Sequence, residues 1–253
     1  MALHKDQAII LSTRVFGESD KIVRFFSLHG GKLTGIAKGG KKSQKRFMNT
    51  LELFNHVDLE YFEKAGKGMV RIDNADLRRP NSGIEASLKK MCVASFFSEF
   101  ADKLTREKER NQGLFELLGK SLERVKSVEF TYSDVLYYQL RMLRHLGYLP
   151  NFVACVHCGK DLADAPRTSF SNERGGVVCA SCAPSVPHRT YPEGLLSGLA
   201  QGAETDGADG LAWVGGVDRA SFERLARDLM EAFVTFHLNV EFKSYRLLRS
   251  VTA

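Results

Sequence analysis

The sequence of 253 residues contains no apolar stretch long enough to cross a membrane. Its apolar runs are short, such as Ala8-Ile9-Ile10-Leu11, whereas a membrane-spanning helix needs about 20 residues. The N-terminus, Met1 to Asp6, has neither the apolar core of a signal peptide nor the character of a transit peptide. We therefore expect a cytoplasmic protein with no membrane partner.

Motifs for nucleotide binding and catalysis are also missing. Gly35 and the run Gly39-Gly40-Lys41-Lys42 superficially resemble a phosphate-binding loop, but they lack its final Gly-Lys-Ser/Thr at the required spacing. The seven histidines are scattered, and no paired acidic or histidine-based catalytic motif is present. We therefore expect no enzymatic activity. The alternative, a metal-dependent enzyme, would predict turnover that a chelator abolishes.

Positive charge is concentrated at one end of the chain. The net charge is +6. Residues 1–80 hold 15 Lys and Arg against 9 Asp and Glu, so they carry the whole surplus, and residues 81–253 are neutral. A basic segment joined to a neutral one indicates a polyanion-binding module attached to another domain. A simple contribution to solubility is the alternative.

The densest cluster of cations lies in residues 31–50, which contain six basic side chains and no acidic one. Such a loop can follow a phosphate backbone and release its counterions, although its spacing does not distinguish DNA from RNA. Phe25, Phe26 and Phe47 offer rings for stacking on bases, unless they belong to a hydrophobic core. The predicted binding residues are Lys38, Lys41, Lys42, Lys45 and Arg46, with Arg14, Lys21 and Arg24 from the preceding segments.

The first 80 residues have the pattern of short strands separated by glycine-rich turns. Runs typical of strands cover residues 7–14, 22–28 and 32–38, near period-two spacing follows over 51–61, and a last strand begins at Met69. About five short strands without a long helix are typical of an OB-type barrel. An SH3-like barrel would give a similar pattern.

The rest of the chain has helical spacing of its apolar residues. We predict helices over residues 84–104, 114–125, 133–146 and 222–236, with Ser133 capping the third and Gly147 ending it. Residues 198–217 are rich in Gly, Ala and Asp and are predicted to form a loop.

Four of the five cysteines form two C-x-x-C pairs, Cys155 with Cys158 and Cys179 with Cys182. Two such pairs can place four thiolates around one ion, which predicts a structural zinc site, one Zn²⁺ per chain, in a zinc ribbon. An iron–sulfur cluster, which four cysteines can also bind, is the alternative occupant of this site. Disulfides are disfavoured because nothing directs export, and four thiolates leave no open position for a catalytic zinc.

Two further residues near these motifs have simpler roles. We expect His157, inside the first pair, to be exposed or to lie behind the ligands rather than to bind the ion. Cys92 lies on an apolar helix face and is expected to belong to the core. Together, these patterns predict an α+β multi-domain fold. It would have an OB domain at residues 1–80 and a helical domain at 81–253 with a zinc-binding insertion at about 150–190.

Several motifs, in the same order along the chain, resemble the RecO family. These are Phe16-Gly17-Glu18-Ser19-Asp20-Lys21-Ile22-Val23, His29-Gly30-Gly31-Lys32-Leu33 with Ala37-Lys38-Gly39, Leu51-Glu52-Leu53-Phe54, the two C-x-x-C pairs, and Lys243-Ser244-Tyr245-Arg246-Leu247-Leu248. The resemblance spans almost the whole chain.

The resemblance implies a role in DNA repair and homologous recombination in the RecF pathway. It implies binding of single- and double-stranded DNA, annealing of complementary strands and, with RecR, loading of RecA onto strands coated with single-stranded DNA-binding protein. Its implied partners are therefore DNA, RecR, the C-terminal tail of single-stranded DNA-binding protein and, indirectly, RecA, in the cytoplasm at the nucleoid. The candidates for the basic rim of a groove for that tail are Arg106, Lys108, Arg110, Arg141 and Arg144, and surface charges that serve only solubility are the alternative.

The residues alone leave one further function open. An RNA-binding, translation-linked OB protein with a zinc ribbon would have the same basic loop and the same cysteines. Deletion of the gene separates the two functions, because sensitivity to ultraviolet light or mitomycin indicates repair and a ribosome or tRNA defect indicates the alternative.

Overall fold

The structure is a computed structural model that describes residues 2–43, 45–64, 66, 68–127, 130–163, 165–205 and 218–251. These residues divide into two compact units, Met1–Glu129 with Arg246–Ala253, and Phe130–Tyr245. The first unit contains β1 (Ala2–Phe16), β2 (Asp20–Ser27), β3 (Gly31–Ala37), β4 (His56–Glu63), β5 (Val70–Arg79), α1 (Leu88–Leu104) and α2 (Gln112–Ser127). Strands therefore give way to helices near residue 80, as expected, but the first compact unit extends beyond that point.

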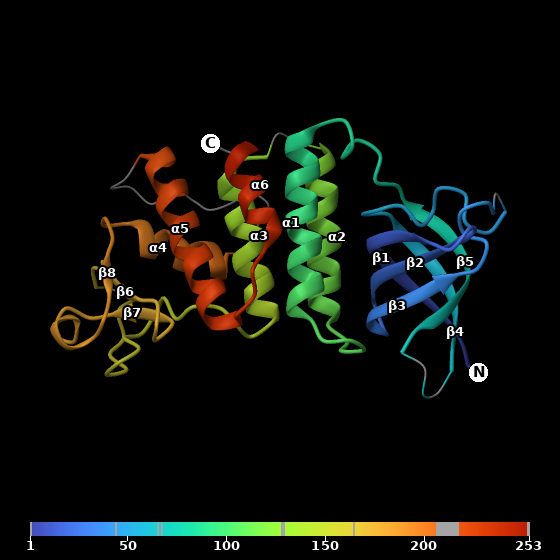
Figure 1. Cartoon of the computed structure of the whole chain (residues 1–253). Coiled ribbons are helices and arrows are strands. Elements are labelled where there is room, and N and C mark those ends of the chain that lie inside the picture. Colours follow the sequence, from blue (N-terminus) through green and yellow to red (C-terminus); the bar gives the residue numbers. More distant parts are fainter. Residues whose placement is uncertain are drawn as a thin grey trace. The chain divides into compact units, whose positions relative to one another are not determined.

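The five strands of the first unit form a closed barrel in the order β1-β2-β3-β5-β4 (Figure 1). Closure depends on β1, which pairs with β4 along its first half and with β2 along its second half. The β3–β5 pair is parallel and the other pairs are antiparallel. This five-stranded closed barrel confirms the OB-type fold predicted from the strand pattern.

Side chains on alternate positions of the strands fill the barrel and cover one of its outer faces. Ile10, Phe25 and Leu59 belong to the interior cluster, and Leu51 and Phe47 from the loop between β3 and β4 complete it. Phe26 is also fully buried. Its ring points to the opposite side of the sheet and packs against Phe115 of α2, at 6.2 Å between ring centroids. One face of the barrel is therefore sealed by a helix.

The strand predicted over residues 51–61 is wrong in its first part, because β4 begins only at His56. Residues 51–54 are turns, and Phe54 has a positive φ of 68°. The Asn55 amide donates to the carbonyls of Asn49 and Thr50. Leu51 still points into the barrel, so burial of a loop residue produced part of the apparent period of two.

The turn between β2 and β3 is held by hydrogen bonds on both of its sides. The buried Asp6 carboxylate accepts hydrogen bonds from the backbone amides of His29 and Gly30, each at 3.0 Å. On the other side, the Lys108 amide donates to the Lys32 carbonyl at 2.9 Å. Gly31 has a positive φ of 67°, and a Cβ there would overlap the Glu109 backbone. This close approach of two backbones requires glycine.

The second unit contains the zinc-ribbon-like segment and the remaining helices. Its elements are α3 (Tyr132–His145), β6 (Ser169–Ser171), β7 (Gly176–Val178), the 3₁₀ helix η1 (Ala183–Ser185), β8 (Arg189–Thr190), α4 (Leu195–Glu204) and α5 (Arg219–Leu238), and α6 (Lys243–Val251) crosses the boundary. β7 and β8 flank β6 in a three-stranded sheet. β6 and β7 form an antiparallel hairpin that leads into the second cysteine pair.

Two sequence expectations in this unit need correction. The cap of α3 is Thr131, whose side chain accepts from the Asp134 amide in a capping box, whereas Ser133 lies within the helix. Residues 198–204 belong to α4 rather than to a loop, because Leu196, Leu199 and Ala203 give this glycine-containing segment a buried apolar face. The rest of that predicted loop, residues 206–217, lies outside the described residues. No helix in the described part of the chain is long and apolar enough to span a membrane.

Gly31→Ala and Gly17→Ala form a matched pair of variants. Both glycines have a positive φ, but a Cβ on Gly17 meets nothing within 4 Å. The left-handed backbone alone should cost Gly17→Ala about 1–2 kcal/mol. Overlap with Glu109 should cost Gly31→Ala a further 1–3 kcal/mol, as an order-of-magnitude estimate. Thermal or denaturant unfolding measures the difference, and equal stability of the two variants would contradict the described packing.

Acid should weaken the fold through His56, which lies at the edge of the barrel against Phe115. Burial, followed by the charges of Arg79 and Arg78, lowers the pKa of His56 to about 4. The His56 imidazole is therefore protonated near pH 6.5 in the unfolded chain but only near pH 4 in the folded chain. The free energy of unfolding falls as the pH drops from about 6.5 to 4, by up to roughly 3 kcal/mol. His56→Phe should flatten this part of the pH profile of unfolding. An unchanged slope would show that other groups cause the acid sensitivity.

Candidate nucleic-acid interface and metal centre

The predicted basic loop follows β3 and is bound to the hairpin that joins β1 and β2. The Asp20 carboxylate, at the start of β2, accepts from the Lys38 ammonium at 2.6 Å and from the Gly39 amide at 2.9 Å. The Lys41 amide donates to the Ser19 carbonyl at 2.8 Å. The Lys38 ammonium, followed by the Gly39 amide, holds the pKa of Asp20 below its ordinary value. The loop and the hairpin tip therefore form one surface.

Four of the eight predicted cations are engaged in holding the fold. Lys21 pairs with Glu52 at 2.9 Å, and Arg24 pairs with Asp102 at 2.9 Å. The Arg46 guanidinium donates to the Lys38 carbonyl at 2.7 Å and so closes the loop. Lys38 is bound to Asp20, although its side chain remains 60% exposed. These residues position the surface, and a phosphate would have to compete with their present partners.

The other four cations are available. Arg14, Lys41, Lys42 and Lys45 are exposed, and none of them forms an ion pair or side-chain hydrogen bond with any residue that the structure describes. Exposed cations without acidic neighbours are the groups that a phosphate backbone neutralises most readily. We call these four residues the free cations of the barrel.

The three phenylalanines considered for base stacking belong to the core. Phe25 and Phe26 are fully buried, and Phe47 is 2% exposed. The core alternative is therefore correct for all three, because Phe25 and Phe47 belong to the interior cluster of the barrel and Phe26 packs against Phe115. A different ring is exposed in this region: Phe16, at the end of β1, is 50% exposed. In the sequence, only the position of Phe16 at the end of a strand, before Gly17, could have indicated that its ring is exposed.

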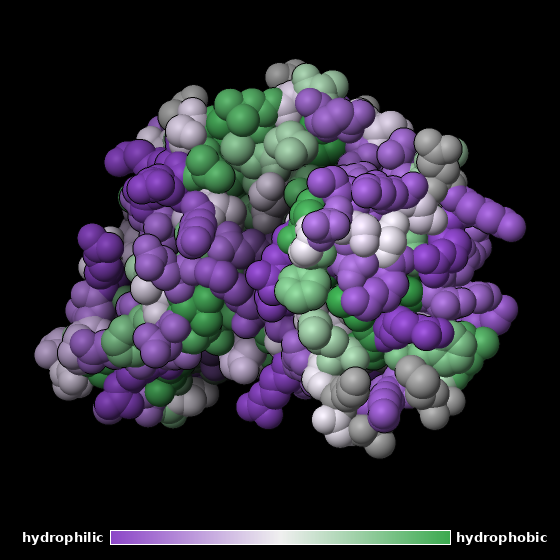
Figure 2. Space-filling model, turned by 45° about the vertical axis from the view of Figure 1, so that its right-hand side comes forward, coloured by the Kyte–Doolittle hydropathy of each residue, from purple (hydrophilic) through white to green (hydrophobic). Residues whose placement is uncertain are grey.

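The barrel side of the molecule carries mostly hydrophilic side chains, with smaller hydrophobic patches among them (Figure 2). Lys32, one of the six basic residues of the segment 31–50, does not contribute to the exposed charge. Its ammonium donates to the carbonyls of Asp102 and Thr105, and the side chain is only 11% exposed. The basic surface is therefore narrower than the composition of the segment indicates.

The predicted groove rim is divided between the two compact units. Arg106, Lys108 and Arg110 lie in the first, where Lys108 pairs with Glu63. Arg141 and Arg144 lie in the second, where they donate to the carbonyls of Thr205 and Ala203 at the end of α4. Three of the five side chains, those of Lys108, Arg141 and Arg144, therefore already bind groups of their own unit, and the rim itself stays a prediction.

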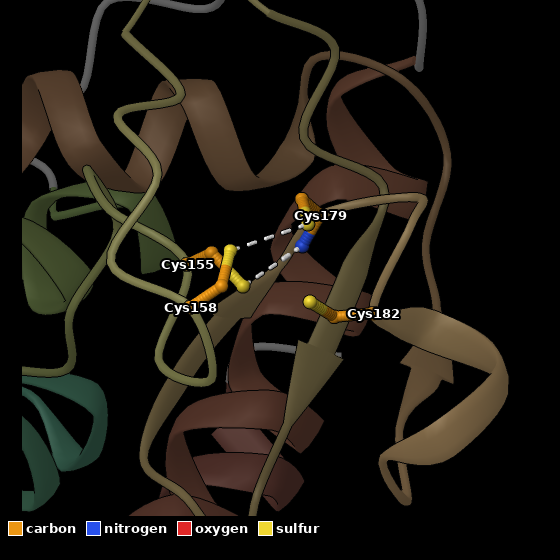
Figure 3. Close-up of side chains that lie close together, drawn as sticks. All are labelled: Cys155, Cys158, Cys179 and Cys182. Atoms are coloured by element: carbon orange, nitrogen blue, oxygen red, sulfur yellow. Dashed lines mark hydrogen bonds between the residues drawn. The ribbon is translucent and has the colours of Figure 1, made fainter.

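The four paired cysteines converge, with the sulfurs of Cys155, Cys158, Cys179 and Cys182 all within 4.8 Å of one another (Figure 3). The sulfurs of Cys158 and Cys179 are 3.8 Å apart, and all five cysteines of the chain are free. Two thiolates bound to one tetrahedral zinc at about 2.3 Å also lie about 3.8 Å apart. The donor set therefore fits a tetrahedral metal ion and not a disulfide.

Backbone hydrogen bonds shape both cysteine turns. The Gly159 amide donates to the Cys155 carbonyl, and the amides of Cys182 and Ala183 donate to the Cys179 carbonyl. The Cys179 amide also donates to the Cys155 sulfur at 3.3 Å. Each C-x-x-C pair therefore forms a tight turn that directs both of its sulfurs to one point.

The local electrostatics favour a thiolate at Cys155. Burial raises the pKa of Cys155, but the amides of Cys179, Cys158 and His157 oppose that effect and bring it to about 6. The hydrogen bond with Cys179 raises the pKa of Cys182 to about 12. Without a metal, deprotonation of all four thiols is therefore unfavourable, because the thiolates repel one another. A divalent cation would offset that repulsion.

The cysteine cluster belongs to a ribbon that packs on α5. Phe170 of β6 is buried and contacts Phe233 of α5, at 6.5 Å between centroids. The His237 ring meets the Asn172 carbonyl at 2.6 Å. His157 is exposed and Cys92 is 4% exposed within α1, as expected for residues outside the cluster.

Comparison with known proteins gives a consistent family. The model described as Recombination protein O N terminal matches residues 1–81, and the model described as Recombination protein O C terminal matches residues 85–246. A DNA repair protein RecO of Myxococcus xanthus is 32% identical over 255 residues, covering 99% of each chain. One of Desulfosudis oleivorans is 30% identical over 258 residues, covering 96% of each. One of Caldanaerobacter subterraneus is 35% identical over 183 residues, covering 72% of each.

The purified chain should contain about one equivalent of metal, because the cluster has four ligands for one ion. Cys158→Ser with Cys182→Ser should abolish metal binding and lower the melting temperature of the ribbon-bearing unit. Cys92→Ala is the control, since it removes a cysteine outside the cluster. Elemental analysis and thermal melts with and without a chelator check both points. A metal-free protein with the same melting curve would contradict the assignment.

Proposed function

This chain belongs to the RecO family of DNA repair proteins, and from that premise we propose that its barrel binds DNA through the free cations. The single observation that carries the proposal is that Arg14, Lys41, Lys42 and Lys45 are exposed without acidic partners beside the hairpin tip. Contacts to phosphate do not depend on the base sequence, and this suits a protein that must act at any damaged site.

We further propose that the protein anneals complementary strands. Two DNA strands repel each other through their phosphates, and neutralisation of these charges on one basic surface lowers that repulsion. The loop would accept both single-stranded and double-stranded DNA, because both present the same phosphates. No nucleotide hydrolysis is required for this step, so the protein would act as a mediator rather than as an enzyme.

The wider role includes partner proteins. With RecR, the protein would help to load RecA onto strands coated with single-stranded DNA-binding protein, whose C-terminal tail would bind to the helical domain. This role belongs at the nucleoid in the cytoplasm. The family assignment favours it over the translation-linked alternative, and mitomycin sensitivity of a deletion strain would support it.

Zinc is the proposed occupant of the cysteine cluster. Four thiolates in two tight turns form a closed tetrahedral site, which leaves no position for a substrate. Cys155, Cys158, Cys179 and Cys182 would hold the ion, and the ion would hold the ribbon against α5. Elemental analysis distinguishes zinc from iron.

The direct test is charge reversal at three of the free cations, Lys41→Glu, Lys42→Glu and Lys45→Glu in one chain. Arg46 is kept, because its guanidinium closes the loop. Binding to labelled single strands and duplexes should be lost at moderate salt, and the slope of log affinity against log salt should decrease by about 2 for single strands. Strand annealing should fall in parallel.

The control reverses three exposed cations elsewhere, Lys120→Glu, Lys160→Glu and Arg174→Glu, and so makes the same change in net charge. It should retain most of the binding. Equal losses in the two variants would show that only overall charge matters. Unchanged affinity of the loop variant at low salt would refute the interface.

A further inference from the structure

Resting on the proposed DNA interface, we infer that Phe16 at the tip of the β1–β2 hairpin stacks on an unpaired nucleobase and gives the surface a preference for single strands. The barrel segment, residues 1–80, contains seven aromatic side chains, all of them among the residues that the structure describes. Five of them are buried, Phe62 is partly covered beneath the Arg71 guanidinium, and Phe16 is the exposed one.

The strand that carries Phe16 extends beyond the core. Strand residues alternate between two faces, so a strand over a packed barrel buries every second side chain. β1 buries the side chains of both faces from Ala8 to Leu11, whereas Arg14, Val15 and Phe16 at its end are all exposed. Val15 is 55% exposed and Phe16 is 50% exposed. The hairpin tip therefore projects from the barrel, with room for a ligand on both of its faces.

Several cations of the proposed DNA interface lie near the ring. Phe16 pairs with Asp20 across the hairpin, and Asp20 holds Lys38 and the Gly39 amide of the basic loop. Arg14 lies two residues before Phe16 and so projects from the same face, about 7 Å along the strand. Lys41 is bound to the hairpin through its amide and Ser19. The ring therefore has Arg14 before it on its own strand and Lys38 beyond Asp20 across the hairpin, and the exposed Glu18 is the acidic residue at the tip.

This combination fits a single strand better than other occupants. A single strand offers phosphates to Arg14 and the loop and an unpaired base to the ring, and base–aromatic stacking does not require a particular base. In a duplex the bases are already stacked, so the ring gains nothing without unpairing. An apolar peptide would match Phe16 and Val15 but would leave the surrounding cations without partners.

The test compares Phe16→Ala with Val15→Ala, a neighbouring exposed residue on the opposite face. Fluorescence anisotropy would be measured for the full chain with a single-stranded oligonucleotide, its duplex, and an abasic single strand of equal length that keeps the phosphates. Phe16→Ala should weaken binding to the normal single strand about tenfold, within the range for removal of one base–aromatic stack. Binding to the duplex and to the abasic strand should stay within about twofold of the unaltered protein, because both retain only the phosphate contacts.

Two further results are expected, and two others would contradict the proposals. Phe16→Trp should restore the affinity for single strands, and Phe16→Ala should leave the salt dependence unchanged, since no cation is removed. If Phe16→Ala binds the normal single strand as the unaltered protein does, or loses no more affinity than Val15→Ala, the stacking inference is overturned and the DNA interface stands. If the unaltered protein binds none of the three oligonucleotides, both proposals fail.

Discussion

The double pairing of β1 is the constraint on which the nucleic-acid surface depends. Residues 2–9 of β1 pair with β4 and residues 8–16 pair with β2, so one strand closes the barrel and then runs past it. This run beyond the barrel creates the hairpin that exposes Arg14 and Phe16. Asp20, at the return of the hairpin, then binds the basic loop. Barrel closure and the position of the cations therefore have one structural cause.

A basic segment is not the same as a basic surface. The sequence alone did not distinguish the role of Lys21, Arg24 and Lys32 from that of Lys41 and Lys42. In the structure, the first three bind Glu52, Asp102 and backbone carbonyls. Such contacts cost little desolvation energy where the ammonium or guanidinium stays partly hydrated. They reduce the positive charge that is available to bind DNA. The charge that DNA would meet is carried by the few cations that have no acidic neighbour.

The metal centre follows a different principle, because its ligands are local. Each C-x-x-C pair forms a turn through hydrogen bonds within a few residues, so spacing alone is sufficient to predict two thiolates on one side of a turn. The meeting of the two turns depends on the β6–β7 hairpin, which leads into the second pair. The cysteine cluster was therefore predictable from the sequence almost completely.

The sequence by itself determined a barrel of about five strands, the change to helices near residue 80, the four cysteines of the cluster and the basic loop, since periodicity, turn residues and ligand spacing are local properties. Pairing between strands far apart in the chain then decided the type of barrel. Only the tertiary structure decided that Phe25, Phe26 and Phe47 are buried and Phe16 is exposed, that Leu51 plugs the barrel from a loop, and which cations lack acidic partners. These outcomes depend on residues distant in the chain, because burial and ion pairing are set by what packs against a side chain and not by its own neighbours in sequence.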